Sequence, residues 1–141
     1  MRRPRRGWCP GSLGGHDDAE VKPEEDAALA ASNKLFYDLP LHSHMGLEIV
    51  QRAPHAVVTM QLSEDVRGPM PGTLHGGMIA TLADVTSALA LWGTYDPAGQ
   101  LPVTTDMHVR YYRQPRSSPI TAETHVVHRG RRILSVRVLD S

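Results

Sequence analysis

Residues 72–94 have the sequence GTLHGGMIATLADVTSALALWGT and contain the longest apolar stretch of the chain. From residue 76 onward, large apolar side chains recur at helical spacing with small residues between them, which predicts a helix over 76–94. Such a helix is apolar on nearly every side, so we expect other elements to wrap around it. Its charged residue, Asp84, stands in the middle of these apolar surroundings.

Strands are predicted on both sides of this helix, because short segments there alternate between apolar and polar residues. Two of them precede the helix, over 46–53 and 55–65, and three follow it, over 103–112, 119–128 and 132–140. The links within each group are too short for parallel crossovers, so the sheet should be largely antiparallel. The expected fold class is α+β, with an antiparallel sheet wrapped around one central apolar helix.

The chain has 141 residues, which is enough for one domain and too little for two. Residues 1–26 are rich in glycine, proline and charge and have no apolar periodicity, so they are predicted to form a flexible N-terminal tail. The folded domain then covers residues 27–141. Good helix formers over 24–37 predict a short helix that Pro40 ends.

The composition excludes several classes of protein. Fifteen basic and fifteen acidic residues balance, which argues against a nucleic-acid binder that depends on overall positive charge. The single cysteine, Cys9, allows neither an internal disulfide nor a multi-cysteine zinc site. The apolar stretches are shorter than the ~20 residues of a membrane helix, and the first arginines lack the apolar segment of an export signal. We therefore expect a cytoplasmic protein with no nucleic-acid or membrane partner.

The order of elements, with GTLHGGMIATLAD at the start of the central helix, resembles the hotdog-fold thioesterases. The resemblance is carried by His75-Gly76-Gly77, by Asp84 nine positions after the histidine, and by the later segment TTDMHVRYYRQP. It is greatest to the PaaI-like acyl-CoA thioesterases of the 4-hydroxybenzoyl-CoA thioesterase superfamily and covers about residues 30–140. It implies a hotdog fold, hydrolysis of acyl-CoA to free CoA and a carboxylic acid, and a homodimer or homotetramer with sites shared between chains.

Two departures from the family pattern bear on function. Many members carry an asparagine six residues before the motif histidine, where this chain has Pro69, so an amide that would help to place the thioester is missing. The family usually has one more strand after the last one predicted here, so the expected sheet lacks its usual last strand. These departures keep open the alternative of a non-catalytic acyl-CoA-binding hotdog protein. An enoyl-CoA hydratase is disfavoured, because its D-x-N-x-x-H pattern is absent.

Gly76 and Gly77 allow two interpretations. They could make only a tight turn, or they could let a carbonyl oxygen approach the first N–H groups of the helix, which have no intrahelical partner. The helix dipole adds positive potential at the same place, so the second interpretation is an oxyanion hole for a thioester. His75 before the glycines and Asp84 after them favour the oxyanion hole, with Gly76 as donor and Gly77 in contact with substrate.

The spacing within the helix limits how these groups could act together. Gly76 and Asp84 are eight residues apart, which is about 12 Å along the axis at ~1.5 Å per residue. A general base must reach its water, and that water must lie about 3 Å from the carbonyl carbon. One helix therefore cannot supply both groups to one carbonyl, whereas Gly76 of one chain and Asp84 of a partner could.

The resemblance implies roles for single residues. Asp84 would be a general base on water or a nucleophile, and the sequence does not separate the two. Thr104, on the strand after the helix, would lie near the attacking group. His75 would orient the loop and polarise the thioester, or it would only cap the helix. The alternative for Asp84 is a structural carboxylate capped by nearby hydroxyls, those of Thr81, Thr86 and Ser87.

Arginines dominate the C-terminal third of the chain. They could dock the phosphates of CoA, or they could be solvated residues that protect strand edges and turns. The candidates for CoA contact are Arg113, Arg116, Arg129 and Arg131. No cofactor is expected beyond the CoA of the substrate. No metal site is expected either, since His42 and His44 have no further ligand at helical spacing and are interpreted as surface loop residues.

Overall fold

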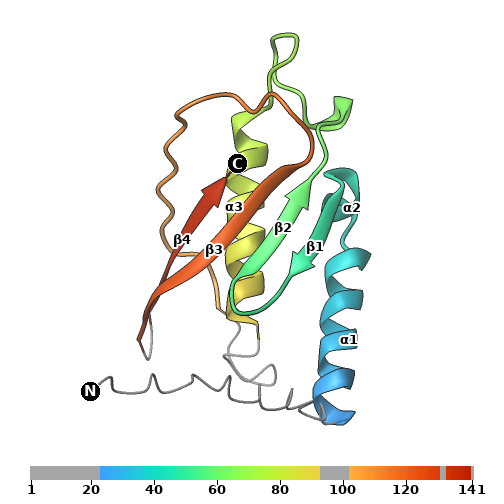
Figure 1. Cartoon of the computed structure of the whole chain (residues 1–141), viewed down its shortest axis with the longest axis vertical. Coiled ribbons are helices and arrows are strands. Elements are labelled where there is room, and N and C mark those ends of the chain that lie inside the picture. Colours follow the sequence, from blue (N-terminus) through green and yellow to red (C-terminus); the bar gives the residue numbers. More distant parts are fainter. Residues whose placement is uncertain (1–22, 93–101, 131–132, 141) are drawn as a thin grey trace, which may run out of the picture.

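A computed structural model describes residues 23–92, 102–130 and 133–140 of the chain. Four strands form one antiparallel sheet in the order β1-β2-β3-β4, and α3 lies across one face of it (Figure 1). The elements in chain order are α1 (Pro23–Asp38), α2 (Pro40–His44), β1 (Leu47–Gln51), β2 (Ala56–Met60), the 3₁₀ turn η1 (Glu64–Val66), α3 (Gly76–Leu91), β3 (Ile120–Arg129) and β4 (Leu134–Asp140).

The core lies between α3 and the sheet. Leu82 of α3 is fully buried, and α3 packs on β2, β3 and β4. Alternate residues of the two central strands face the helix, so that one face of each strand enters the core. These residues are Ala56, Val58, Met60, Ile120 and Ala122. The prediction of an α+β fold with an antiparallel sheet around one apolar helix is confirmed.

The two N-terminal helices lie beside β1 and the central helix (Figure 1). The helix predicted over 24–37 is α1, which begins at Pro23, so residues 23–26 are helical although they were assigned to the tail. Residues 1–22 of that tail lie outside the described residues. Pro40 ends α1 as predicted, but it also begins the short α2, which the sequence pattern did not predict; proline is favoured in the first turn of a helix.

Most predicted elements are present with shorter bounds. The strands predicted over 46–53 and 55–65 are β1 and β2, and the final two are β3 and β4. The central helix ends at Leu91 rather than at residue 94, and Trp92 is its C-cap with extended backbone angles. No helix in the described parts of the chain is long and apolar enough to cross a membrane.

The prediction of a strand over 103–112 is wrong. Residues 102–112 belong to no strand of the sheet, and their side chains are exposed except for the half-buried Val109. An alternating sequence forms a strand only where a neighbouring strand takes up its N–H and C=O groups. This segment instead runs beside the sheet as an extended chain (Figure 1), and two of its side chains contact α3.

Candidate active site

The start of α3 is capped by the histidine of the HGG motif. His75 is the N-cap residue, and its Nδ1 accepts a hydrogen bond of 3.1 Å from the N–H of Gly77. A neutral imidazole that accepts at Nδ1 carries its proton at Nε2, so the exposed edge of this ring is a donor. The N–H of Gly76 donates to no residue that the structure describes. The capping role of His75 is thus present, and the Gly76 N–H has no hydrogen-bond partner among the described residues.

Two residues after the central helix hold its start in place. The Tyr111 hydroxyl donates to the Gly76 carbonyl at 2.9 Å, and the Leu74 N–H donates to Gln114 Oε1 at 3.0 Å. No sequence signal marks Tyr111 or Gln114 as a site residue, although both lie in the TTDMHVRYYRQP segment that carries the family resemblance. Their contacts tie the start of α3 and the residue before its N-cap to the segment 111–114.

Asp84 is half-buried in the middle of α3. Among the described residues, its carboxylate has one hydrogen-bond partner. Thr104 Oγ1 donates to Asp84 Oδ1 at 2.5 Å, so the structure brings these two predicted site residues together. The idea of a carboxylate capped by helix hydroxyls is wrong. Those hydroxyls donate instead to backbone carbonyls four residues earlier in α3, which belong to Gly77, Leu82 and Ala83.

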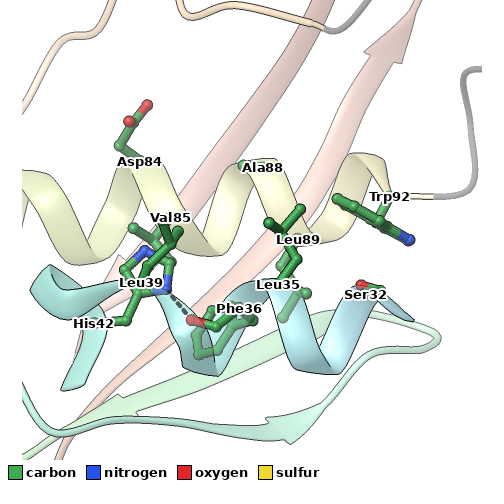
Figure 2. Close-up of a pocket in the computed structure, with 10 residues that line it drawn as sticks. All are labelled: Ser32, Leu35, Phe36, Leu39, His42, Asp84, Val85, Ala88, Leu89 and Trp92. Atoms are coloured by element: carbon green, nitrogen blue, oxygen red, sulfur yellow. Dashed lines mark hydrogen bonds between the residues drawn. The ribbon is translucent and has the colours of Figure 1, made fainter. Parts of the chain in front are cut away.

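Asp84 borders two hollows of the surface. One of about 220 Å³ lies between α3 and the two N-terminal helices, and its walls are mainly apolar (Figure 2). The other, of about 210 Å³, lies on the side of the 102–112 segment and includes Thr104 and Met107. Figure 2 shows the Asp84 carboxylate pointing away from α1 and α2, while Val85 and Leu89 point toward them. The carboxylate therefore lies on the Thr104 side of α3, while the residue as a whole borders both hollows.

His42 lines the apolar hollow, and the prediction of a surface loop histidine is wrong for it. It lies in α2, is only 8% exposed, and its Nδ1 is 2.9 Å from the carbonyl oxygen of Phe36. Because a carbonyl only accepts, Nδ1 carries the proton of the neutral ring. Burial lowers the pKa of His42, and the hydrogen bond to Phe36 offsets part of this effect. His44, by contrast, is exposed beside Asp65.

The predicted CoA-binding arginines are separated within one chain. Arg113 and Arg116 are exposed in the loop that leads to β3, next to Gln114 and its contact with the start of α3. Arg129 ends β3 at the hairpin to β4, at the opposite end of the sheet from the start of α3 (Figure 1). Arg131 lies outside the described residues. Of the four, Arg113 and Arg116 lie in the loop that contacts the start of α3.

Known proteins resemble this chain in sequence and in fold. The thioesterase superfamily model matches residues 71–139, which include α3, Thr104, β3 and all of β4 except Asp140. The matched stretch, just under half of the chain, is similar to the thioesterase superfamily. The resemblance carried by His75-Gly76-Gly77 and Asp84 is therefore confirmed at the level of the family.

Solved structures show the fold of this chain to be the hotdog fold. The zebra fish thioesterase superfamily member 2 is 27% identical, with a TM-score of 0.65 over 80% of this chain and 83% of that one. A Thermus thermophilus protein is 28% identical, with a TM-score of 0.63 over 73% of this chain and 85% of its own.

Two curated relatives also match this chain. Acyl-coenzyme A thioesterase 13 from Homo sapiens and from Pongo abelii is in each case 33% identical over 86 residues, which is 60% of this chain. The chain likewise spans 60% of the length of these curated relatives.

Proposed function

We propose that this chain hydrolyses acyl-CoA thioesters to free CoA and a carboxylic acid. The observation that carries the proposal is Asp84, a half-buried residue that borders an apolar hollow and whose carboxylate is bonded to Thr104. A carboxylate on an apolar helix is costly unless it is paired or used. The relatives named acyl-coenzyme A thioesterase support the same substrate class.

In this proposal Asp84 is the general base on water or the nucleophile. Its Oδ1 accepts from Thr104, and no described residue bonds to Oδ2. The hydrogen bond holds the carboxylate in one orientation, so Oδ2 is the oxygen that takes a proton from water or attacks the carbonyl carbon. Thr104 is then a positioning residue, and the chemistry uses no cofactor beyond the CoA part of the substrate.

The Gly76 N–H would bind the thioester oxygen and the oxyanion that develops on it. A donor at the start of a helix is already in place before reaction and adds to the potential of the helix dipole. The Nε2–H of His75 is a second donor on the exposed side of the same loop. The N–H of Gly77 already donates to His75, so Gly77 would not bond to the substrate. Because it has no side chain, it would let the substrate come close to the backbone.

The two halves of this machinery would meet across a dimer. Gly76 and Asp84 both lie on α3, eight residues and about 12 Å apart along its axis, so one chain does not bring them to one carbonyl. In a two-fold dimer the Gly76 end of one α3 would approach Asp84 of the other, which makes two equal sites. This assembly, as a dimer or as a tetramer of such dimers, is part of the proposal.

The hollow and the arginines suggest how the substrate would lie. The mainly apolar hollow beside Asp84 suits an apolar acyl group, which gains by leaving water. Exposed Arg113 and Arg116 suit the phosphates of CoA, because guanidinium groups bind phosphate with two hydrogen bonds. Arg129 and Arg131 would contribute only if the partner subunit brings them near.

The test is release of free CoA thiol from a panel of acyl-CoAs by the wild type and by Asp84→Asn. The asparagine keeps the size of the side chain and an acceptor for Thr104 but loses the basicity, so turnover should fall by about 10² or more. Substrate binding should remain, because the Gly76 donor is unchanged.

Two results would contradict the proposal. A folded Asp84→Asn protein with the wild-type rate would remove Asp84 from the chemistry. A wild type that binds acyl-CoA but releases no thiol would support the non-catalytic acyl-CoA-binding alternative, for which Pro69 at the usual asparagine position is the sequence argument.

A further inference from the structure

The outer face of the sheet carries two imidazoles and a carboxylate close together. Glu123 and His125 are two residues apart on β3, so their side chains project from the same face. Thr124 between them is buried on the α3 side, which places both on the opposite face. Ala56 of β2 pairs with Thr124, and the residue before Ala56 is His55. The register therefore sets His55 beside His125.

The three side chains converge on one point. His125 Nε2 lies 3.1 Å from Glu123 Oε1, and the rings of His55 and His125 have centroids 4.1 Å apart. One possible ligand atom from each of the three residues lies within 4.8 Å of the other two. The backbone of His55 is also held, since its carbonyl accepts a hydrogen bond of 3.0 Å from Gln51 Nε2 across the β1–β2 turn.

This donor set has a recognisable chemistry. Two imidazole nitrogens and one carboxylate oxygen are ligands that Zn²⁺ takes in proteins, and with bonds of about 2.1 Å the ligand atoms of a tetrahedral site lie about 3.4 Å apart. Small side-chain rotations would bring the three atoms to that spacing. A Glu123–His125 ion pair would use only two of the three groups. It would not explain why the imidazole of His55 lies beside them.

We propose that His55, Glu123 and His125 form a binding site for a divalent transition metal ion of the zinc type, separate from the thioesterase machinery. The side chains of His125 and Glu123 are 36% and 43% exposed, so a fourth position is open to water. A search of the sequence for metal ligands at helical spacing misses this site, because two neighbouring strands bring its residues together. The bound ion would link the start of β2 to β3.

The test is calorimetric titration of the tag-free, chelator-treated chain with Zn²⁺. We expect one ion bound per chain and an affinity at least tenfold weaker in His125→Ala, a loss of the size seen when zinc coordination is disturbed. Co²⁺ replaces Zn²⁺ as a visible probe, and its tetrahedral absorption should disappear in His55→Ala and weaken in Glu123→Gln. Zn²⁺ should also raise the melting temperature of the wild type, because it binds the folded chain.

His44→Gln is the matched control. His44 is likewise an exposed histidine beside a carboxylate, with Nε2 at 3.8 Å from Asp65 Oδ1, but it belongs to no three-ligand cluster of the described residues. The His44→Gln variant should bind Zn²⁺ as tightly as the wild type. The Cys9→Ser variant should do so too. The site is disproved if the folded double variant His55→Ala/His125→Ala binds Zn²⁺ as tightly as the wild type, or if either control loses the binding.

Discussion

The Thr104 hydroxyl lies 2.5 Å from the Asp84 carboxylate, although the two residues are twenty positions apart in the chain. Tyr111, seven residues after Thr104, donates to the carbonyl of Gly76 at the other end of the candidate machinery. One extended segment thus contacts both the carboxylate and the helix start. It has no strand partner among the described residues, so these side-chain contacts are what we expect to hold it beside α3.

Replacing Thr104 separates orientation of the carboxylate from its basicity. Thr104→Val keeps the shape but removes the hydroxyl, and turnover should fall about tenfold, the cost of one hydrogen bond to a charged group. Thr104→Ser keeps the donor and should retain most of the rate. Because Thr104 is exposed, neither variant should change the melting temperature by more than a few degrees. Steady-state CoA release measures turnover, and thermal unfolding measures the melting temperature. Equal rates for Thr104→Val and Thr104→Ser would show that the hydroxyl is not used.

Gly76→Pro removes one N–H with little disturbance of the helix. Gly76 is the first residue of α3, where proline is favoured, and His75 already has the extended angles that precede a proline, with φ −67° and ψ 123°. Turnover should fall by about 10²-fold or more, the usual loss for one oxyanion donor.

Gly76→Ala is the control for this change. A Cβ atom at Gly76 would lie 3.5 Å from the Tyr111 ring, which is ordinary contact, and alanine keeps the N–H. We expect its loss of turnover to be much smaller than that of the proline variant. If alanine and proline reduce the rate equally, space rather than the N–H donor is what Gly76 provides.

Mixing two inactive variants tests the shared site. In a dimer of one Asp84→Asn chain and one Gly76→Pro chain, one site carries both changes and the other carries neither. Random exchange of equal amounts should therefore restore about a quarter of the wild-type rate, because half of the dimers are mixed and each has one intact site. Sites built within one chain would give no recovery after exchange is verified by native mass spectrometry. A stable, fully active monomer in light scattering would also exclude the shared site.

His42 should make the fold less stable in acid. Burial lowers its pKa in the folded chain below the ordinary 6.5, so between these two values the unfolded chain binds a proton that the folded chain does not. The free energy of unfolding should fall as the pH drops below about 6.5, by at most about 1.4 kcal/mol per pH unit from this residue.

His42→Asn tests this pH dependence. Its amide nitrogen can stand where Nδ1 donates to Phe36, but it does not titrate, so the slope of stability against pH should become shallower. Urea unfolding at several pH values between 5 and 8 measures the slope. Identical slopes for the two proteins would show that another group causes the acid sensitivity.

Elements with a local signal could be predicted from the amino-acid sequence. The apolar spacing after residue 76 predicts α3, and the turn signals around β1, β2, β3 and β4 predict the hairpins, because periodicity and turn chemistry act over a few residues. His75-Gly76-Gly77 and Asp84 were found for the same reason: their spacing along one helix is visible in the chain. The same spacing led to the shared-site prediction, which remains to be tested.

Features that depend on neighbours distant in sequence became visible only in the folded chain. The clean alternation of 103–112 predicted a strand, but no described strand pairs with this segment. Two of its side chains contact α3 instead, and one of these contacts joins Thr104 to Asp84. His42 is buried because α1, α2 and α3 pack around it, although its flanking sequence is that of a surface turn. His55 joins Glu123 and His125 through the register of β2 against β3, a pairing set by burying alternate residues of both strands against α3.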